Sequence, residues 1–263
     1  MRIVIQSDAS AVAAFAAREI AKQVAYKPHS CLGLATGGTP VGAYRELIQI
    51  HRTSHLSFAN VTTFNLDEYV GLTANHPCSY RTFMNEHLFS HLDIPLNQTF
   101  VPIGDASDLV TECIAYEERI GLAGGIDLQL LGIGSDGHIA FNEPGSSLGS
   151  RTRVKTLLQQ TRIDNARFFD SMDLVPTSAI TMGIGTILDS KAILLIACGE
   201  GKAEAIAGAA EGPLSASLPA SSLQMHPCVT LVVDESAASG LMRADYYRMS
   251  ERERHRLEVG TGQ

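Results

Sequence analysis

Residues 31–51 read CLGLATGGTPVGAYRELIQIH, and this stretch decides the fold class. The apolar run 31–35 predicts a buried strand, and residues 41–51 carry apolar side chains at helical spacing, which predicts a helix. The same order recurs along the chain, with strands predicted at 2–6, 61–65, 126–132, 192–197 and 229–233 and helices at 10–26, 80–91, 108–121, 201–211 and from 237 onward. Continuous apolar strands that alternate with helices indicate an α/β fold, with a doubly wound, mostly parallel sheet covered by helices on both faces.

The length of 263 residues suits one large α/β domain, which we place over residues 1–263. The region 134–176 is rich in Gly, Ser, Arg and Asn and has little periodicity. Irregular segments of that length are typical of active-site loops, so we expect a lid here. The charged segment from about 250 to 263 is expected to be a partly helical, mobile tail.

Composition excludes several classes of protein. Apolar residues make up 45% and charged residues 18%, so a disordered chain is excluded. The net charge is −8 with no basic run, which argues against a nucleic-acid partner. No apolar run approaches the length of a membrane span. Five cysteines without a CxxC pair argue against zinc ribbons, and the N-terminus lacks a secretory pattern, so we expect a cytoplasmic protein with reduced thiols.

The turn Ala35-Thr36-Gly37-Gly38-Thr39-Pro40 is the first candidate site. Glycines let a ligand approach the backbone, and free N–H groups at a helix start attract an anion. The turn lacks the G-K-[ST] of a nucleotide P-loop. A tight strand–helix turn without any ligand is the alternative.

The segment Asn65-Leu66-Asp67-Glu68-Tyr69 follows the strand 61–65. Ligands of open α/β sheets bind at that end of the strands, where the acidic pair Asp67 and Glu68 could act as a base or a metal ligand. Spacing alone favours a helix N-cap followed by a solvated acid.

The segment 132–144, GIGSDGHIAFNEP, is the third candidate. It contains G-x-G-x-x-G, but Asn142, Pro144 and Gly145 interrupt the helix that a dinucleotide site needs. Asp136, His138 and Glu143 lie within eight residues of one another, and flanking carboxylates orient a histidine for proton transfer. A metal site and a purely structural histidine are the alternatives.

Cationic residues form the last group: Arg151, Arg153, Lys155, Arg167 and Lys202. In an acidic chain with a Gly-Thr turn they suggest an anionic ligand, whereas ordinary surface charge is the alternative for each one.

Residues 132–144 resemble the signature of glucosamine-6-phosphate deaminases. Further blocks resemble that family in register over about residues 1–245: ATGGTP (35–40), NLDEYVGL (65–72), HPCSY (76–80), SSLGSRTRVKTL (146–157), NARFF (165–169) and AITMGIGTIL (179–188).

The resemblance implies conversion of glucosamine 6-phosphate and water to fructose 6-phosphate and ammonia, a hydrolytic step of amino-sugar catabolism without metal or organic cofactor. It implies that Asp67 moves a proton between C2 and C1 and that His138 assists ring opening, tuned by Asp136 and Glu143. It also implies a phosphate site formed by Thr36, Gly37, Gly38, Thr39, Arg167 and Lys202.

The family also contains hexamers activated by N-acetylglucosamine 6-phosphate at subunit interfaces. Carried over by motif, that effector's phosphate would be held by Ser146, Arg153, Lys155 and Thr156, with Tyr247 as an aromatic partner. The resemblance therefore implies a homo-oligomer with an allosteric site.

Two other functions stay open. A 6-phosphogluconolactonase would share the fold and the core of segment 132–138, but we would expect a different continuation after His138 and no Asp-Glu-Tyr-Val-Gly block. A non-catalytic sugar-phosphate regulator would keep the phosphate turn without needing Asp67, His138 and Glu143 together. Release of ammonia from glucosamine 6-phosphate separates the three.

Overall fold

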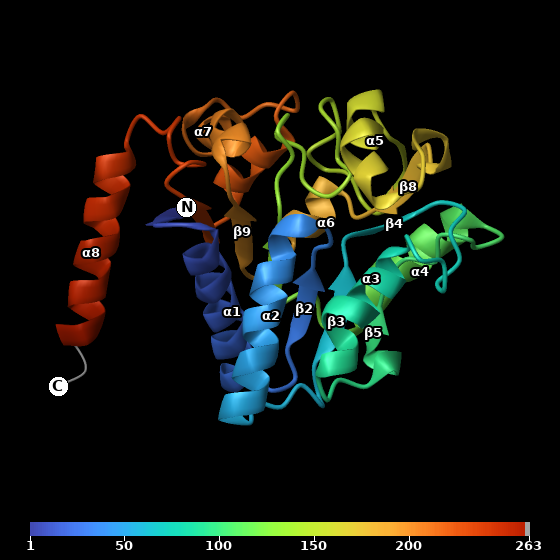
Figure 1. Cartoon of the computed structure of the whole chain (residues 1–263), viewed down its shortest axis with the longest axis horizontal. Helices are drawn as coiled ribbons and strands as arrows, with labels where there is room; N and C mark the ends of the chain where they lie inside the picture. Colours follow the sequence, from blue (N-terminus) through green and yellow to red (C-terminus); the bar gives the residue numbers. More distant parts are fainter. Residues whose placement is uncertain (261–263) are drawn as a thin grey trace.

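The structure is a computed structural model that describes residues 1–260. Its centre is a seven-stranded sheet in the order β1-β10-β9-β6-β2-β3-β5 (Figure 1), and every pairing within it is parallel. The prediction of a mostly parallel, doubly wound α/β fold is confirmed. The strands of the chain are β1 (Arg2–Gln6), β2 (Cys31–Leu34), β3 (Thr62–Asn65), β4 (Asp67–Tyr69), β5 (Thr99–Phe100), β6 (Leu128–Leu131), β7 (Arg153–Thr156), β8 (Ser178–Thr181), β9 (Ile193–Ala197) and β10 (Val229–Asp234).

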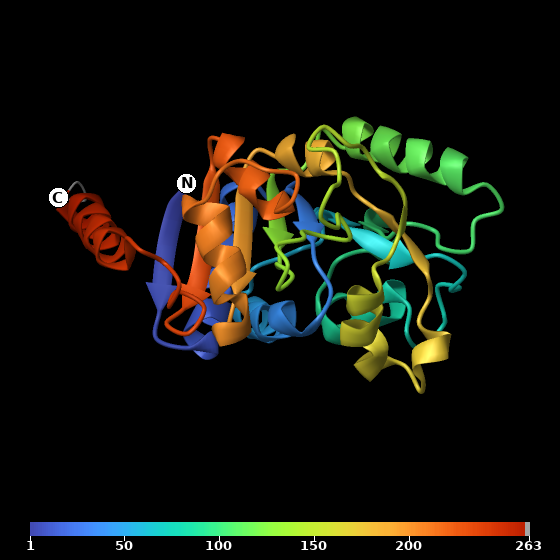
Figure 2. The same ribbon diagram turned by 90° about the horizontal axis from the view of Figure 1, so that it is seen from above.

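Helices cover both faces of this sheet. Figure 2 shows α2 and α4 on opposite sides of it when the molecule is seen from above. The α-helices are α1 (Ala9–Tyr26), α2 (Gly38–Ser54), α3 (Tyr80–His87), α4 (Leu109–Leu122), α5 (Gln159–Asn165), α6 (Ile184–Leu188), α7 (Ala203–Glu211) and α8 (Ala244–Gly260). Short 3-10 helices are η1 (Phe89–His91), η2 (Leu96–Gln98), η3 (Ala166–Phe168), η4 (Met172–Leu174), η5 (Glu200–Lys202) and η6 (Pro219–Met225).

The sequence explains why these elements form. All residues of β2, β6 and β9 are buried, as continuous apolar runs predict for strands covered on both faces. Asp8 caps α1 by accepting a hydrogen bond from the backbone N–H of Ala11 at 2.9 Å. The core lies between the sheet and the helices that flank it.

The order of the strands reverses next to β2. From β2 the chain proceeds through β3 to β5 at one edge, whereas from β6 it proceeds through β9 to β10 on the other side. The crevice at the carboxyl ends of strands beside such a reversal is the usual ligand site of doubly wound folds. The turns after β2, β3 and β6 are the three segments singled out in the sequence, so the topology brings them to one edge.

A second sheet, which the sequence analysis did not predict, has the order β4-β8-β7 and is antiparallel. In its register Asp67 pairs with Thr181, and Thr181 pairs with Arg153 on the other side. Asp67 therefore belongs to a strand, and the interpretation of the segment as a helix N-cap with a solvated acid was wrong.

The stretch expected to be an irregular lid, 134–176, contains β7, α5, η3 and η4. The sequence missed these elements because β7 is a short polar edge strand and α5 has only seven residues.

The C-terminal region also differs from expectation. Residues 235–243 form turns, and the helix predicted from residue 237 begins at Ala244 and runs to Gly260. The predicted helical part of the tail extends to residue 260, and Glu251 pairs with Arg2 of β1. Residues 261–263 lie outside the described residues. No helix among residues 1–260 is long and apolar enough to cross a membrane.

Candidate active site

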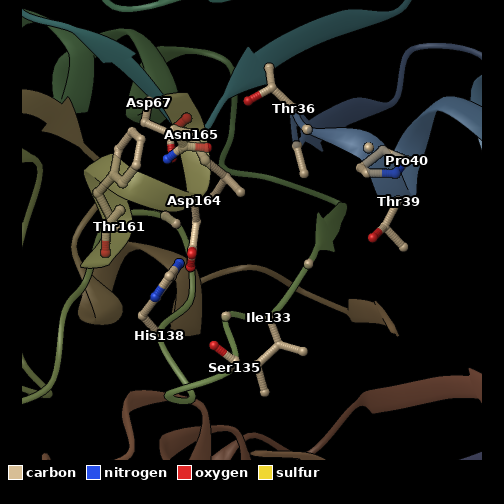
Figure 3. A pocket seen from close by; sticks show the side chains of 18 of the residues that line it. Thr36, Thr39, Pro40, Asp67, Ile133, Ser135, His138, Thr161, Asp164 and Asn165 are labelled. Atoms are coloured by element: carbon tan, nitrogen blue, oxygen red, sulfur yellow. The ribbon is translucent and has the colours of Figure 1, made fainter. Parts of the chain in front are cut away.

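A pocket of about 190 Å³ opens at the carboxyl ends of β2, β3 and β6 (Figure 3). The three sequence segments singled out above all contribute to it, as do α5, η3 and η5. Its lining residues are Ala35, Thr36, Gly37, Gly38, Thr39, Pro40, Leu66, Asp67, Tyr80, Gly132, Ile133, Gly134, Ser135, His138, Ala140, Phe141, Thr161, Asp164, Asn165, Arg167 and Lys202.

One end of the pocket is suited to an anion. The turn 36–39 leads into α2, and Gly37 has φ +96°, a conformation that glycine adopts without strain. Arg167 and Lys202 line the same pocket, and neither forms a salt bridge with any residue in the described part of the chain. Burial lowers the pKa of Lys202, while the charges of Asp164 and Asp136 oppose that shift. Two unpaired cations beside a helix start provide the charge that a phosphate dianion needs.

Asp67 lies on another wall of the pocket, and its side chain is only 6% exposed. Burial, and secondarily the charge of Glu68, raises the pKa of Asp67 to about 8. A carboxyl group with a pKa in this range can exchange protons near neutral pH, as a general base must.

Glu68 has a different environment from its neighbour. Its carboxylate accepts hydrogen bonds from the backbone N–H groups of Tyr69, Tyr80 and Arg81 at 2.9, 3.0 and 3.1 Å. Burial raises the pKa of Glu68 to about 7, although these donors and Arg81 oppose the shift. Glu68 thus holds the first turn of α3, whereas Asp67 faces the pocket.

His138 is held between two carboxylates. Its Nδ1 lies 2.7 Å from an oxygen of Asp136 and 3.8 Å from Oε2 of Glu143. Because both carboxylates approach Nδ1, Nε2 is the ring nitrogen that can serve a substrate. Donor atoms of the three residues lie within 4.8 Å of one another, so the same group could also hold a metal ion.

The loop around His138 is closely fitted. A side chain at Gly134 would meet the His138 ring, since a Cβ there would lie 2.3 Å from it. Ala140 has φ +52°, a left-handed conformation that is uncommon outside glycine and persists only where neighbours enforce it. The two residues after Ala140 make the contacts that hold this conformation. The Phe141 N–H donates to Thr181 Oγ1 at 3.0 Å. The Asn142 side-chain amide donates to the carbonyls of Ile139 and Met182 at 3.0 and 2.8 Å.

Several lining residues were not given a role from the sequence: Ser135, Tyr80, Thr161, Asp164 and Asn165. Ser135 belongs to segment 132–144, Asn165 to the NARFF block and Tyr80 to the HPCSY block, so the resemblance offered a signal for these three. Thr161 and Asp164 lie in a polar helix of seven residues whose sequence gives no sign of a site.

The residues expected to bind an effector do not line this pocket. Arg153 and Lys155 are half-buried on one face of β7, whereas Thr156 is exposed on the other face by strand alternation. Ser146 is buried, and its hydroxyl oxygen has no hydrogen-bond partner within residues 1–260. Tyr247 lies on α8 beyond β1, at the far end of the molecule from β7 and β8 (Figure 1). One chain therefore does not bring the five residues together. Arg151 instead pairs with Glu117 and Asp189.

Comparisons with known proteins agree with this geometry. The sequence model of a family described as glucosamine-6-phosphate isomerases/6-phosphogluconolactonase matches residues 6–232. A glucosamine-6-phosphate deaminase of Cellvibrio japonicus is 55% identical over 257 residues, covering 98% of each chain. Another, of Shewanella halifaxensis, is 54% identical over 262 residues and covers all of both chains.

Solved structures give the same result. A structure described as a monomeric glucosamine-6-phosphate deaminase superposes with a TM-score of 0.90 and 50% identity, covering 91% of this chain and 100% of that one. A 6-phosphogluconolactonase of Trypanosoma brucei has a TM-score of 0.71 but 21% identity, covering 91% of this chain and 98% of that one. The similarity to the 6-phosphogluconolactonase shows a shared fold and no more.

Proposed function

Because the chain belongs to the family of glucosamine-6-phosphate isomerases and 6-phosphogluconolactonases, we propose that it converts glucosamine 6-phosphate and water to fructose 6-phosphate and ammonia. One observation carries this choice within the family. A buried carboxyl group, Asp67, and His138, which Asp136 and Glu143 hold at Nδ1, line one pocket together with Arg167 and Lys202, and neither cation forms a salt bridge within residues 1–260. In net terms the reaction is a hydrolytic loss of the amine coupled to an aldose–ketose isomerisation.

The phosphate end of the pocket orients the sugar. The turn Thr36–Thr39, Lys202 and Arg167 bind the 6-phosphate, and this interaction does not change during the reaction at C1 and C2. Binding energy from such a remote group positions the reacting carbons against the catalytic side chains.

Ring opening is the task of His138. Its Nε2 takes the proton of the C1 hydroxyl and returns it to the ring oxygen as the C1–O5 bond breaks, which gives the open-chain aldehyde. The carboxylates of Asp136 and Glu143 at Nδ1 stabilise the protonated imidazole that forms between these transfers.

Asp67 performs the isomerisation. Its ionised carboxylate removes the C2 proton, the electrons of that C–H bond form the C1=C2 double bond, and the carbonyl electrons pass to O1. The proton is then delivered to C1. One N–H proton passes to O1, so that O1 becomes a hydroxyl and the nitrogen at C2 becomes an imine. Attack of water at C2 and rupture of the C–N bond release ammonia and leave the ketone of fructose 6-phosphate.

Ammonia release tests this proposal. Purified protein should release one ammonia and form one fructose 6-phosphate for each glucosamine 6-phosphate consumed, with and without EDTA. Dependence on an added metal would instead assign Asp136, His138 and Glu143 to a metal shell. Hydrolysis of 6-phosphogluconolactone without ammonia release would assign the lactonase function, and sugar-phosphate binding without turnover would assign a regulator.

The rate is expected to depend steeply on pH. Asp67 acts in its ionised form, and burial raises its pKa to about 8. Below that pH the ionised fraction grows about tenfold per pH unit, so kcat/KM should rise at close to this rate between about pH 6 and 7 and level off above about pH 8. Initial rates at saturating and limiting substrate, measured across that range, check it. A flat profile would contradict the role of Asp67.

We propose further that N-acetylglucosamine 6-phosphate binds beside β7 in a homo-oligomer. The half-buried Arg153 and Lys155 on one face of an edge strand support anion binding there, and Tyr247 could join them only from another copy. The relative described as monomeric argues for a single chain instead.

Initial-rate curves with and without this effector test the allosteric response, and sedimentation measures the oligomeric state. We expect the effector to lower the half-saturating substrate concentration by about 5- to 150-fold, and Arg153→Ala to abolish this response. Hyperbolic curves unchanged by millimolar effector in a monomer would remove the allosteric proposal.

A further inference from the structure

The carboxylate of Glu143 is held asymmetrically. Its Oε1 accepts hydrogen bonds from the backbone N–H of Leu158 at 3.1 Å and from the hydroxyl of Thr161 at 2.7 Å. Its Oε2 is buried without a hydrogen-bond partner in the described part of the chain and lies 3.8 Å from His138 Nδ1. One oxygen is thus fixed, and the other is directed at the histidine.

Thr161 is the side chain that fixes this arrangement. The terminal torsion of a glutamate is broad, so one backbone donor alone leaves the carboxylate free to turn about its last bond. A second donor, from the first turn of α5, removes that freedom. Thr161 is itself 4% exposed and lines the pocket, on the same side as His138 (Figure 3).

We propose that Thr161 is a positioning residue for ring opening: it holds Glu143 so that Oε2 remains at His138 Nδ1. This inference rests on the proposed deaminase function. Thr161 belongs to α5, which leads directly into η3 and Arg167, so adjoining elements carry a residue proposed to bind the phosphate and the residue that fixes Glu143. The two contributions can be measured separately, because loss of the Thr161 hydroxyl should lower kcat, whereas loss of Arg167 should weaken phosphate binding.

Thr161→Val tests the proposal, since valine keeps the shape and removes only the hydroxyl. We expect kcat to fall about tenfold, KM to change less than about twofold, and Thr161→Ser to restore most of kcat. Binding of an acyclic hexitol 6-phosphate, which needs no ring opening, should stay unchanged. Thr186→Val is the matched control, because Thr186 is a buried threonine that donates to Glu117 at 2.6 Å outside the pocket; it should retain the wild-type kcat.

A double-mutant cycle makes the test specific to Glu143. In a Glu143→Gln background, Thr161→Val should cause no further loss of kcat. An additive loss, a weakened hexitol phosphate affinity, or a valine variant with wild-type kcat would overturn the proposal. Wild-type protein that releases no ammonia would refute the proposed function instead, so the two failures are distinguishable.

Discussion

Replacing Asp67 with asparagine is expected to lower kcat at least about 100-fold, because general-base catalysis contributes roughly 10²–10⁴-fold. Asparagine has nearly the same shape but cannot accept the C2 proton. Binding of fructose 6-phosphate should remain close to the wild-type value, since the phosphate contacts lie at the other end of the pocket. Turnover by ammonia release and product affinity by calorimetry measure the two quantities. A variant with more than a tenth of the wild-type kcat would refute the assignment.

The free energy of unfolding shows whether the Asp67→Asn variant is folded normally. The folded chain raises the pKa of Asp67 from 3.8 to about 8, so between these values it retains a proton that the unfolded chain releases. The contribution of Asp67 to the free energy of unfolding is therefore complete below about pH 4 and is lost as the pH rises towards 8. The asparagine variant cannot ionise, so it should be at least as stable as wild type at pH 8, measured by urea unfolding.

Removal of the phosphate cations should weaken binding of fructose 6-phosphate with little effect on binding of unphosphorylated fructose. A charge-assisted contact contributes about 1.5–3 kcal/mol, so Lys202→Ala should raise the Kd roughly 10- to 150-fold. Arg167→Ala should have a smaller effect, because Arg167 is exposed and solvent screens its charge.

Lys22→Ala is the matched control for these variants, since Lys22 is an exposed lysine that pairs with Glu19 away from the pocket. Its Kd should equal that of wild type. Unchanged affinity in Lys202→Ala and Arg167→Ala would place the phosphate elsewhere.

Six strands of the main sheet could be predicted because they carry their own signal, whereas β5 was missed because it has only two residues. A run such as Ile193–Ala197 is apolar throughout and buried on both faces, so neither neighbours nor register are needed to recognise it. The three segments of the site were singled out one by one from the sequence. The structure brings Gly37, Asp67 and His138 to one pocket because segments that end adjacent parallel strands meet at one edge of the sheet.

The second sheet could not be predicted, because its strands are short and polar and depend on distant partners. Asp67 looked like a helix cap since the sequence does not reveal its pairing with Thr181. Thr161 was missed for a similar reason. Its importance arises from a contact with a residue 18 positions away, and its own helix shows no pattern of a site.

The cross-strand row of Asp67, Thr181 and Arg153 has a consequence for how the chain can vary. Successive side chains of a strand point to opposite faces, so a slip of one residue in the β4–β8 ladder would turn the Asp67 carboxyl away from the pocket. The direction of the Asp67 side chain depends on the register of the backbone, so many side-chain replacements in β7 and β8 would leave it unchanged. A single-residue insertion or deletion within β8 would disable the base even though every catalytic side chain remained in the sequence.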